Sequence, residues 1–163
     1  MANKRICILD AGPLIHLDEL GSLELLQSLG EIFIPESVAY EAEKHRNGVT
    51  EKIRPYIVRE AETLSWKLAE VIEKFSLGTG ETAALAWAEK FGADLFVSDD
   101  QSARVAANGL GYKSTGTLGV IVEAADVGAV SVSDAISLLE SVRIRTTLHA
   151  STALLKKVIA SLR

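Results

Sequence analysis

Short apolar runs alternate along the chain with longer stretches in which apolar residues recur at helical spacing. The clearest runs cover residues 5–9, 31–34 and 95–98, and each is bounded by charged or turn-forming residues. Residues 112–114 form a weaker candidate strand, and residues 57–58 fit either an edge strand or a loop. Strands separated by helices predict a parallel α/β sheet.

The intervening stretches predict helices with recognisable ends. Pro13 suits a first helical turn, Ser22 is a good N-cap, and Gly30 ends the second helical segment. The predicted helices after Pro13 cover 22–29, 35–44, 61–75, 81–91, 102–108, 117–125, 133–142 and 150–162.

The chain length and hydrophobic content fit one domain. With 163 residues and 48% hydrophobic content, we expect a single domain over 1–163, with a core at about 5–145 and a C-terminal helix at about 150–162. No apolar run approaches the roughly 20 residues that cross a bilayer, so we expect a cytoplasmic protein with no membrane partner. The single cysteine, Cys7, lies in an apolar run and reads as a small core residue.

The net charge of −5 is unevenly distributed. Residues 1–100 carry 10 Lys/Arg against 18 Asp/Glu, whereas residues 101–163 carry 7 against 4. A site made of several carboxylates contributes such acidity and needs cations, so the charge is compatible with a metal-dependent nuclease. A solvated acidic surface without functional meaning explains most of these side chains equally well.

Acidic residues directly follow two of the three clearest strands. Asp10 follows the first, and the pair Asp99 and Asp100 follows the third. Ligands of open parallel sheets bind beyond the carboxyl ends of the strands, so chemistry is expected there. Each acid also has a structural interpretation, because Asp10 and one of the pair can cap the helices that follow.

Two further acids lie on predicted helices. Glu81 stands in a first helical turn, where a negative charge is favourable, and the small residues after it allow this helix to approach the sheet closely. Glu41 shares a helical face with Val38, whereas Glu43 is expected to point toward water. Each acid alone fits a structural role, but their joint placement favours a common site.

Rival motifs are weaker. The Gly78-Thr-Gly80 segment follows a predicted helix rather than a strand, which disfavours a dinucleotide site, and no Walker lysine follows it. A phosphatase with Asp10 as nucleophile would have a second Asp where Gly12 stands. The three histidines show no triad or zinc spacing, and His16 is expected at a helix surface or boundary.

Five motifs occur in a characteristic order over roughly residues 5–145. They are Asp10-Ala-Gly-Pro-Leu-Ile-His-Leu17, Ile34-Pro-Glu-Ser-Val-Ala-Tyr-Glu41, Leu77-Gly-Thr-Gly-Glu-Thr-Ala-Ala-Leu-Ala86, Val97-Ser-Asp-Asp-Gln-Ser-Ala-Arg104 and Gly116-Thr-Leu-Gly119. Together they resemble the PIN-like family of small prokaryotic proteins, relatives of VapC-type toxin ribonucleases.

This resemblance implies a three-layer α/β/α fold and a metal-dependent endoribonuclease that hydrolyses RNA with Mg²⁺ or Mn²⁺. The resemblance assigns catalysis and metal binding to Asp10, Glu41, Glu81 and one of Asp99 and Asp100, which spacing does not distinguish. It further implies the toxin of a toxin–antitoxin pair, with an antitoxin protein as partner. The segment Ala11-Gly12 offers no side-chain ligand where many PIN domains have Ser, Thr or Asn, so the alternative is a catalytically weak or inactive module that binds RNA or protein.

Two further expectations concern partners. The basic second part of the chain suggests that Arg104 and Lys113 bind the RNA backbone, although solvated surface charges explain both equally well or better. Residues 13–29 carry more leucine than two short helices need for one core face, which predicts a homodimer or an inhibitor contact through residues 13–29 and 61–75. The alternative is that these leucines are buried within the monomer.

Overall fold

Five parallel strands form one sheet at the centre of the molecule. The computed structural model describes residues 4–59 and 63–163. The strand order is β3-β2-β1-β4-β5. The strands are β1 (Ile6–Leu9), β2 (Glu31–Pro35), β3 (Ile57–Val58), β4 (Leu95–Val97) and β5 (Lys113–Thr115). The parallel α/β sheet expected from the sequence is therefore confirmed, and residues 57–58 form an edge strand.

Helices connect the strands and continue after the last one. The α-helices are α1 (Ala11–Glu19), α2 (Glu36–His45), α3 (Val49–Ile53), α4 (Trp66–Phe75), α5 (Thr79–Phe91), α6 (Gln101–Gly109), α7 (Thr117–Asp126), α8 (Val132–Arg145) and α9 (Thr152–Ser161). Two 3₁₀ segments, η1 (Leu23–Ser28) and η2 (Arg54–Tyr56), complete the described elements. Within the described ranges, no helix is long and apolar enough to cross a membrane.

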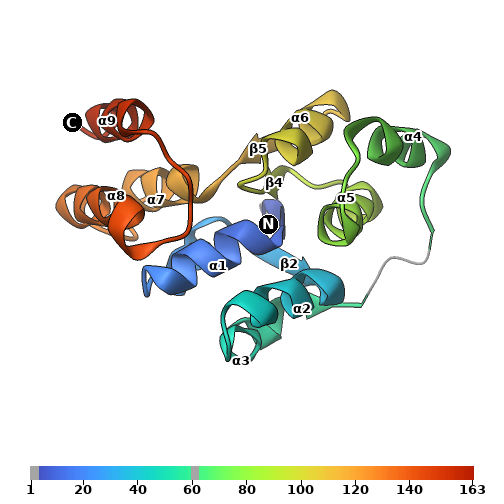
Figure 1. Cartoon of the computed structure of the whole chain (residues 1–163), viewed down its shortest axis with the longest axis horizontal. Coiled ribbons are helices and arrows are strands. Elements are labelled where there is room, and N and C mark those ends of the chain that lie inside the picture. Colours follow the sequence, from blue (N-terminus) through green and yellow to red (C-terminus); the bar gives the residue numbers. More distant parts are fainter. Residues whose placement is uncertain (1–3, 60–62) are drawn as a thin grey trace.

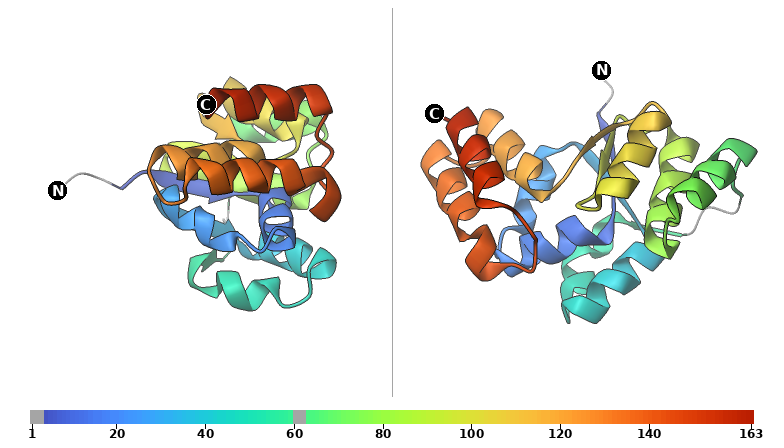
Figure 2. Two further views of the ribbon diagram at one scale, coloured as in Figure 1. Left: turned by 90° about the vertical axis from the view of Figure 1, so that its left-hand side faces the viewer. Right: turned by 45° about the horizontal axis from the view of Figure 1, so that its top comes forward.

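The helices cover both faces of the sheet, which confirms the three-layer α/β/α arrangement (Figure 1). Right-handed crossovers place α1 and α2 on one face and α5 and α6 on the other, because the chain moves outward from β1 to β3 and then returns to β4. α7 packs against α1 and α8. The last helix, α9, lies beside α8 at the end of the chain (Figure 2).

The leucines of residues 13–29 belong to the core of the monomer. Leu23 is partly buried and packs against this core. The other six are at most 4% exposed: Leu14, Leu17, Leu20, Leu25, Leu26 and Leu29. The expectation that they form a contact surface was wrong, because α2 and α7 pack against α1, and β2 and α7 pack against η1. Cys7 is fully buried, as expected of a small core residue.

Some element boundaries differ from the sequence expectation. Residues 23–28 form a 3₁₀ rather than an α-helix, and Ser22 makes no side-chain cap. α4 begins at Trp66 instead of residue 61, with Ser65 capping the amide of Leu68 at 3.1 Å, while residues 60–62 lie outside the described residues. The short helix α3 was not predicted, because the polar segment before it reads as a loop.

Candidate active site

The carboxyl ends of β1 and β4 lie side by side at the point where the strand order reverses. β1 pairs with β2 on one side and with β4 on the other. The amide of Asp10 donates to the carbonyl of Val97 at 2.9 Å, which extends this pairing past the last strand residue. A crevice at such a reversal is the usual ligand site of a parallel sheet. Asp10 and the Asp99–Asp100 pair therefore lie at the edge of the sheet where a ligand site is expected.

Asp10 is buried and held by two hydrogen bonds. It is 5% exposed, and its carboxylate accepts from the amide of Ala11 at 2.8 Å and from the hydroxyl of Ser98 at 2.7 Å. Burial raises its pKa to about 7; the nearby charges of Glu81 and Glu41 add to this rise, and the two hydrogen bonds oppose it. Asp10 is thus both the N-cap of α1 and a carboxylate whose charge lacks compensation.

Glu41 reaches the same place from α2. A Cβ atom added to Gly80 would lie 2.6 Å from Oε2 of Glu41 and 3.5 Å from Oδ1 of Asp10. Both oxygens therefore border the same small space, which is open because residue 80 has no side chain. Burial and the charge of Glu81 raise the pKa of Glu41.

Glu81 lies in the first turn of α5, one residue beyond Gly80. Its carboxylate folds back so that a Cβ at Gly78 would lie 2.7 Å from Oε2. Since Glu81 raises the pKa of both Asp10 and Glu41, the three carboxylates act on one another electrostatically. The structure brings together the first three predicted acids, from the end of β1, from α2 and from α5.

Asp99 is engaged with different partners. Its carboxylate accepts from the amide of Thr117 at 2.7 Å and from the hydroxyl of Thr117 at 2.6 Å, and it lies 2.6 Å from Nδ1 of His16. Burial alone would raise the pKa of Asp99, but the hydrogen bonds from His16 and Thr117 outweigh it and lower the pKa. Asp99 therefore joins α1 to the start of α7, and its charge is compensated.

Asp100 caps a helix and is exposed. Its carboxylate accepts from the amide of Ala103 at 2.7 Å, which identifies it as the N-cap of α6. Its own amide donates to the hydroxyl of Ser98 at 3.1 Å. The expected convergence of all four acidic positions is thus seen for three, and the metal-binding role of Asp99 or Asp100 stays a prediction. Within residues 4–59 and 63–163, no three His, Cys, Asp or Glu side chains are spaced to hold a metal ion as they stand.

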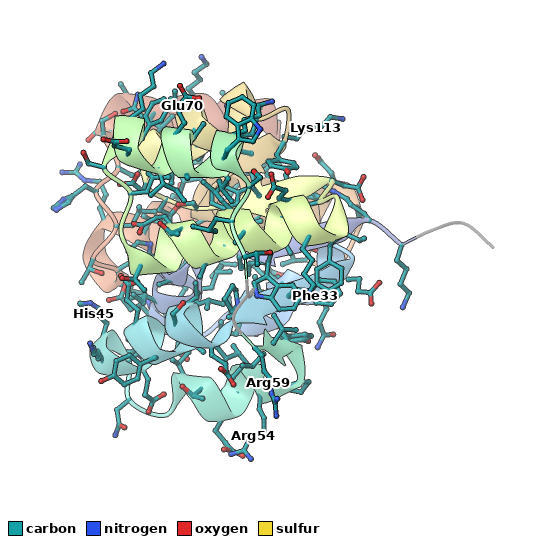
Figure 3. The ribbon with its side chains drawn as sticks, turned by 90° about the vertical axis from the view of Figure 1, so that its right-hand side faces the viewer. Phe33, His45, Arg54, Arg59, Glu70 and Lys113 are labelled. Atoms are coloured by element: carbon teal, nitrogen blue, oxygen red, sulfur yellow. The ribbon has the colours of Figure 1, made fainter. Side chains whose placement is uncertain are left out.

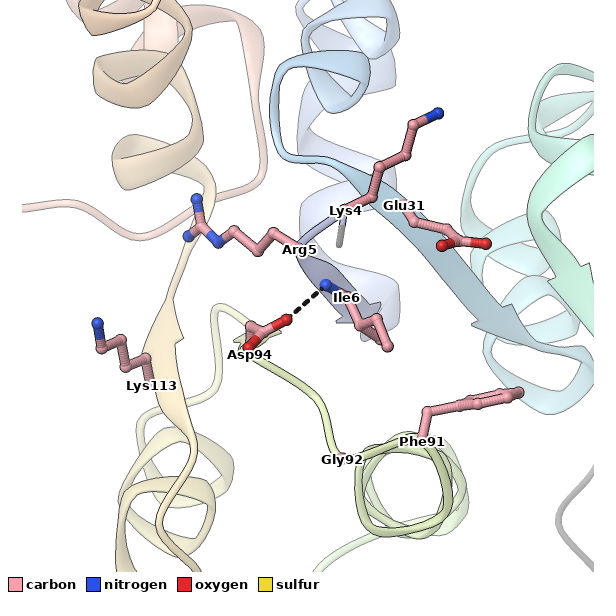
Figure 4. A pocket seen from close by; sticks show the side chains of 8 residues that line it. All are labelled: Lys4, Arg5, Ile6, Glu31, Phe91, Gly92, Asp94 and Lys113. Atoms are coloured by element: carbon pink, nitrogen blue, oxygen red, sulfur yellow. Dashed lines mark hydrogen bonds between the residues drawn. The ribbon is translucent and has the colours of Figure 1, made fainter. Parts of the chain in front are cut away.

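The two predicted RNA-binding cations lie in different places. Arg104 is next to the acidic residues, because its Nη1 donates to the carbonyl of Ser98 at 2.8 Å. Lys113 begins β5 and lies at the opposite end of the sheet, where it lines an open pocket of about 980 Å³ with Lys4, Arg5 and Asp94 (Figure 4). The role of Lys113 in RNA binding stays a prediction, but it concerns a surface away from the carboxylates.

Sequence reasoning missed Ser98, Thr117 and the role of His16. His16 lies at a boundary position, one of the two that were expected, because its side chain is 12% exposed, but its pairing with Asp99 was not predicted. The sequence contains one signal for this pair: Gly12 and His16 are four residues apart on one face of α1, and a Cβ at Gly12 would lie 3.2 Å from Cβ of Asp99. Because Gly12 has no side chain, Asp99 can approach α1 closely, and His16, one turn after Gly12, contacts Asp99.

Comparison with protein families agrees with this arrangement. The model of the DUF3368 family, described as a PIN domain, matches residues 6–163. The chain belongs to the PIN-domain family. The match extends beyond residue 145 and includes α9, so the C-terminal helices of this PIN domain are part of the family's pattern. PIN domains are generally nucleases and typically use a divalent metal. A comparison with curated protein sequences finds no significant match.

The carboxylates near Gly80 fit a divalent metal in chemistry and charge. Hard divalent cations prefer oxygen ligands, and Asp10, Glu41 and Glu81 supply only carboxylate oxygens. No ion pair of the described residues involves any of the three, whereas Asp99 is paired. A cation would lower the raised pKa values of Asp10 and Glu41, because opposite charge favours the ionised form.

Proposed function

We propose that this PIN domain is a metal-dependent endoribonuclease that hydrolyses RNA with Mg²⁺ or Mn²⁺. One observation carries the proposal: Asp10 and Glu41, from separate elements, border the same space at Gly80, and the charge of the nearby Glu81 helps to raise the pKa of both without a compensating cation. Like charges that repel in the free protein are costly to stability, and a bound cation removes this cost. Such a cluster is typical of a site that binds metal.

The residues of the site have separate roles in this proposal. Asp10, Glu41 and Glu81 hold the metal, and the fourth acidic position, Asp99 or Asp100, contributes from the end of β4. When bound, a divalent metal supplies an acidified water and neutralises charge on the phosphate. The Ser98 hydroxyl fixes Oδ2 of Asp10, and the Asp99–His16–Thr117 contacts fix the loop after β4 against α1 and α7. Arg104 lies where it can bind an RNA phosphate beside the site.

A cleavage assay tests the proposal. A mixed pool of RNA is incubated with the protein in Mn²⁺ or Mg²⁺, and EDTA should abolish cleavage. Asp10→Asn should lose activity, whereas Asp126→Asn should not, because Asp126 is an exposed acid at the end of α7. Cleavage that persists in EDTA, or in Asp10→Asn, would contradict the metal-dependent mechanism.

The alternative is a catalytically weak or inactive module that binds RNA or protein. The engagement of Asp99 with His16 and Thr117 favours it, because a fully paired carboxylate is a poor metal ligand. The same assay separates the two: RNA that binds but stays intact in both metals supports the module.

We further propose that the protein is the toxin of a toxin–antitoxin pair in the cytoplasm and that α4 carries its contact surface. Trp66 is 80% exposed and Leu64 is 46% exposed at the start of this helix, whereas the leucines of α1 are buried. Exposed large apolar side chains favour contact with a second copy or a short inhibitor. Light scattering tests the homodimer against the 17.5 kDa chain mass, and a pull-down with the product of the neighbouring gene tests the antitoxin.

A further inference from the structure

Tyr40 is a large aromatic residue that the fold leaves exposed on α2, the helix that also carries Glu41. Its side chain is 66% exposed, while Val38, Ala39 and Ala42 of the same helix are buried. The next residue, Glu41, borders Gly80 and Asp10. An exposed aromatic ring gains little for the core, so this position offers a flat apolar surface on the helix that supplies Glu41.

Two basic residues accompany this ring on the last turns of α2. Nζ of Lys44 lies 4.3 Å from the centroid of the Tyr40 ring. Lys44 and His45 follow Glu41 by three and four residues, so they share its flank of the helix. Burial and Glu81 raise the pKa of Glu41, and the charges of His45 and Lys44 oppose this rise, so both lie within electrostatic reach of the cluster. Figure 3 shows His45 at the edge of the molecule, away from Lys113.

The neighbouring acid of α2 does not cancel these charges. Glu43 turns to the loop after the helix, where its carboxylate accepts from the amides of Gly48 at 2.7 Å and Thr50 at 2.8 Å. Glu36 lies in the first turn, one turn before Tyr40. The end of α2 therefore presents an aromatic ring, the adjoining Lys44 ammonium and the His45 imidazole on the helix that supplies Glu41.

We propose that Tyr40, Lys44 and His45 form a subsite for single-stranded RNA, in which a base stacks on the Tyr40 ring and Lys44 and His45 contact the adjoining phosphate. Aromatic rings flanked by cations suit single strands because every base has a face that stacks and every nucleotide a phosphate. This inference rests on the proposed nuclease function: a strand held on α2 would pass directly beside Glu41. Base stacking on Tyr40 and phosphate contacts with Lys44 and His45 would offset the electrostatic repulsion between the RNA phosphates and the carboxylates.

Binding without cleavage tests the subsite separately from the enzyme activity. A short fluorescein-labelled single-stranded RNA is titrated with protein in EDTA at low salt, and anisotropy gives the affinity. Tyr40→Ala should weaken binding about ten-fold, because stacking of one base contributes roughly 1–3 kcal/mol. Tyr40→Phe should keep the affinity, and Lys44→Gln should reduce the slope of log affinity against log salt by about one.

Matched controls come from other helices. Ile144→Ala removes an exposed large apolar residue from α8, and Lys157→Gln removes an exposed cation from α9; neither should change the affinity. A second RNA with abasic positions should bind wild type and Tyr40→Ala equally. Thermal melts establish that each variant is folded.

Three outcomes would overturn the subsite. They are equal affinity of wild type and Tyr40→Ala, equal loss in Tyr40→Ala and Ile144→Ala, and no binding of RNA by the wild type at low salt. If RNA binds through Tyr40 but no metal supports cleavage, the subsite stands and the nuclease proposal fails. If cleavage occurs and Tyr40→Ala leaves both KM and affinity unchanged, the nuclease stands and the subsite fails.

Discussion

Replacing Gly80 by alanine adds one methyl group to the space between two carboxylates. The added Cβ would lie 2.6 Å from Oε2 of Glu41, closer than such atoms approach, and 3.5 Å from Oδ1 of Asp10, an ordinary contact. The atom in the way is the end of a flexible side chain, so Glu41 can rotate aside while the backbone stays in place. The substitution therefore moves one carboxylate of the cluster and leaves Asp10 where it is.

The expected effects on stability and on metal binding have opposite signs. Gly80 is the second residue of α5, and alanine is a better helix former than glycine, by up to about 1 kcal/mol at an interior position and by less in a first turn. The free protein should therefore be as stable as the wild type or slightly more stable. Displacing one of three carboxylates should weaken metal binding at least about ten-fold. At saturating metal, that loss removes about 1.4 kcal/mol of ligand stabilisation, which is roughly 3–6 °C in Tm for a chain of this size.

Thermal melts with and without Mn²⁺ measure both effects, and RNA cleavage supplies a second readout. Gly109→Ala is the matched control, because Gly109 is the last residue of α6 and a Cβ there would have no neighbour within 4 Å. It should keep the full shift with Mn²⁺ and the full activity. If Gly80→Ala also keeps both, Glu41 does not bind metal and the carboxylate cluster is structural.

Three further predictions concern charges around the site. Asp10→Asn should stabilise the metal-free protein at pH 8 by about 2 kcal/mol. Because the pKa of Asp10 is raised to about 7, the wild type loses stability as the pH rises from about 4 to 7, and the variant should not. A lower Tm of the variant without metal would indicate that Asp10 acts only as a helix cap. Asp99→Asn should instead destabilise the folded protein at pH 7 by about 1–2 kcal/mol. The ionised Asp99 contributes stability above about pH 4 because its pKa is lowered, and this contribution is lost on acidification. Urea unfolding from pH 3 to 8 measures the free energy of unfolding of both proteins. Arg104→Ala should reduce the salt dependence of RNA binding by about one phosphate contact, and identical affinities across a salt series would reject that role.

The sequence was sufficient to predict the parallel sheet and the acidic ends of its strands. Buried strands such as 5–9 and 95–98 are continuous apolar runs, and the acids after them follow from local order alone. Glu41 and Glu81 could be proposed from helical faces and from resemblance to the PIN family. Local patterns were weaker for residues 22–29, where helical spacing does not distinguish a 3₁₀ segment from an α-helix.

Only the tertiary structure decided which charges are compensated and which apolar residues are covered. The leucines of α1 and η1 look excessive for one face, but they are buried because α2 and α7 pack against α1, and β2 and α7 pack against η1. Asp10 and Asp99 both follow strand ends, yet Asp10 meets Glu41 across Gly80 within reach of the Glu81 charge, whereas Asp99 meets His16 and Thr117. Their pKa values move in opposite directions because the shift depends on neighbours brought from other elements, and no local pattern specifies those neighbours.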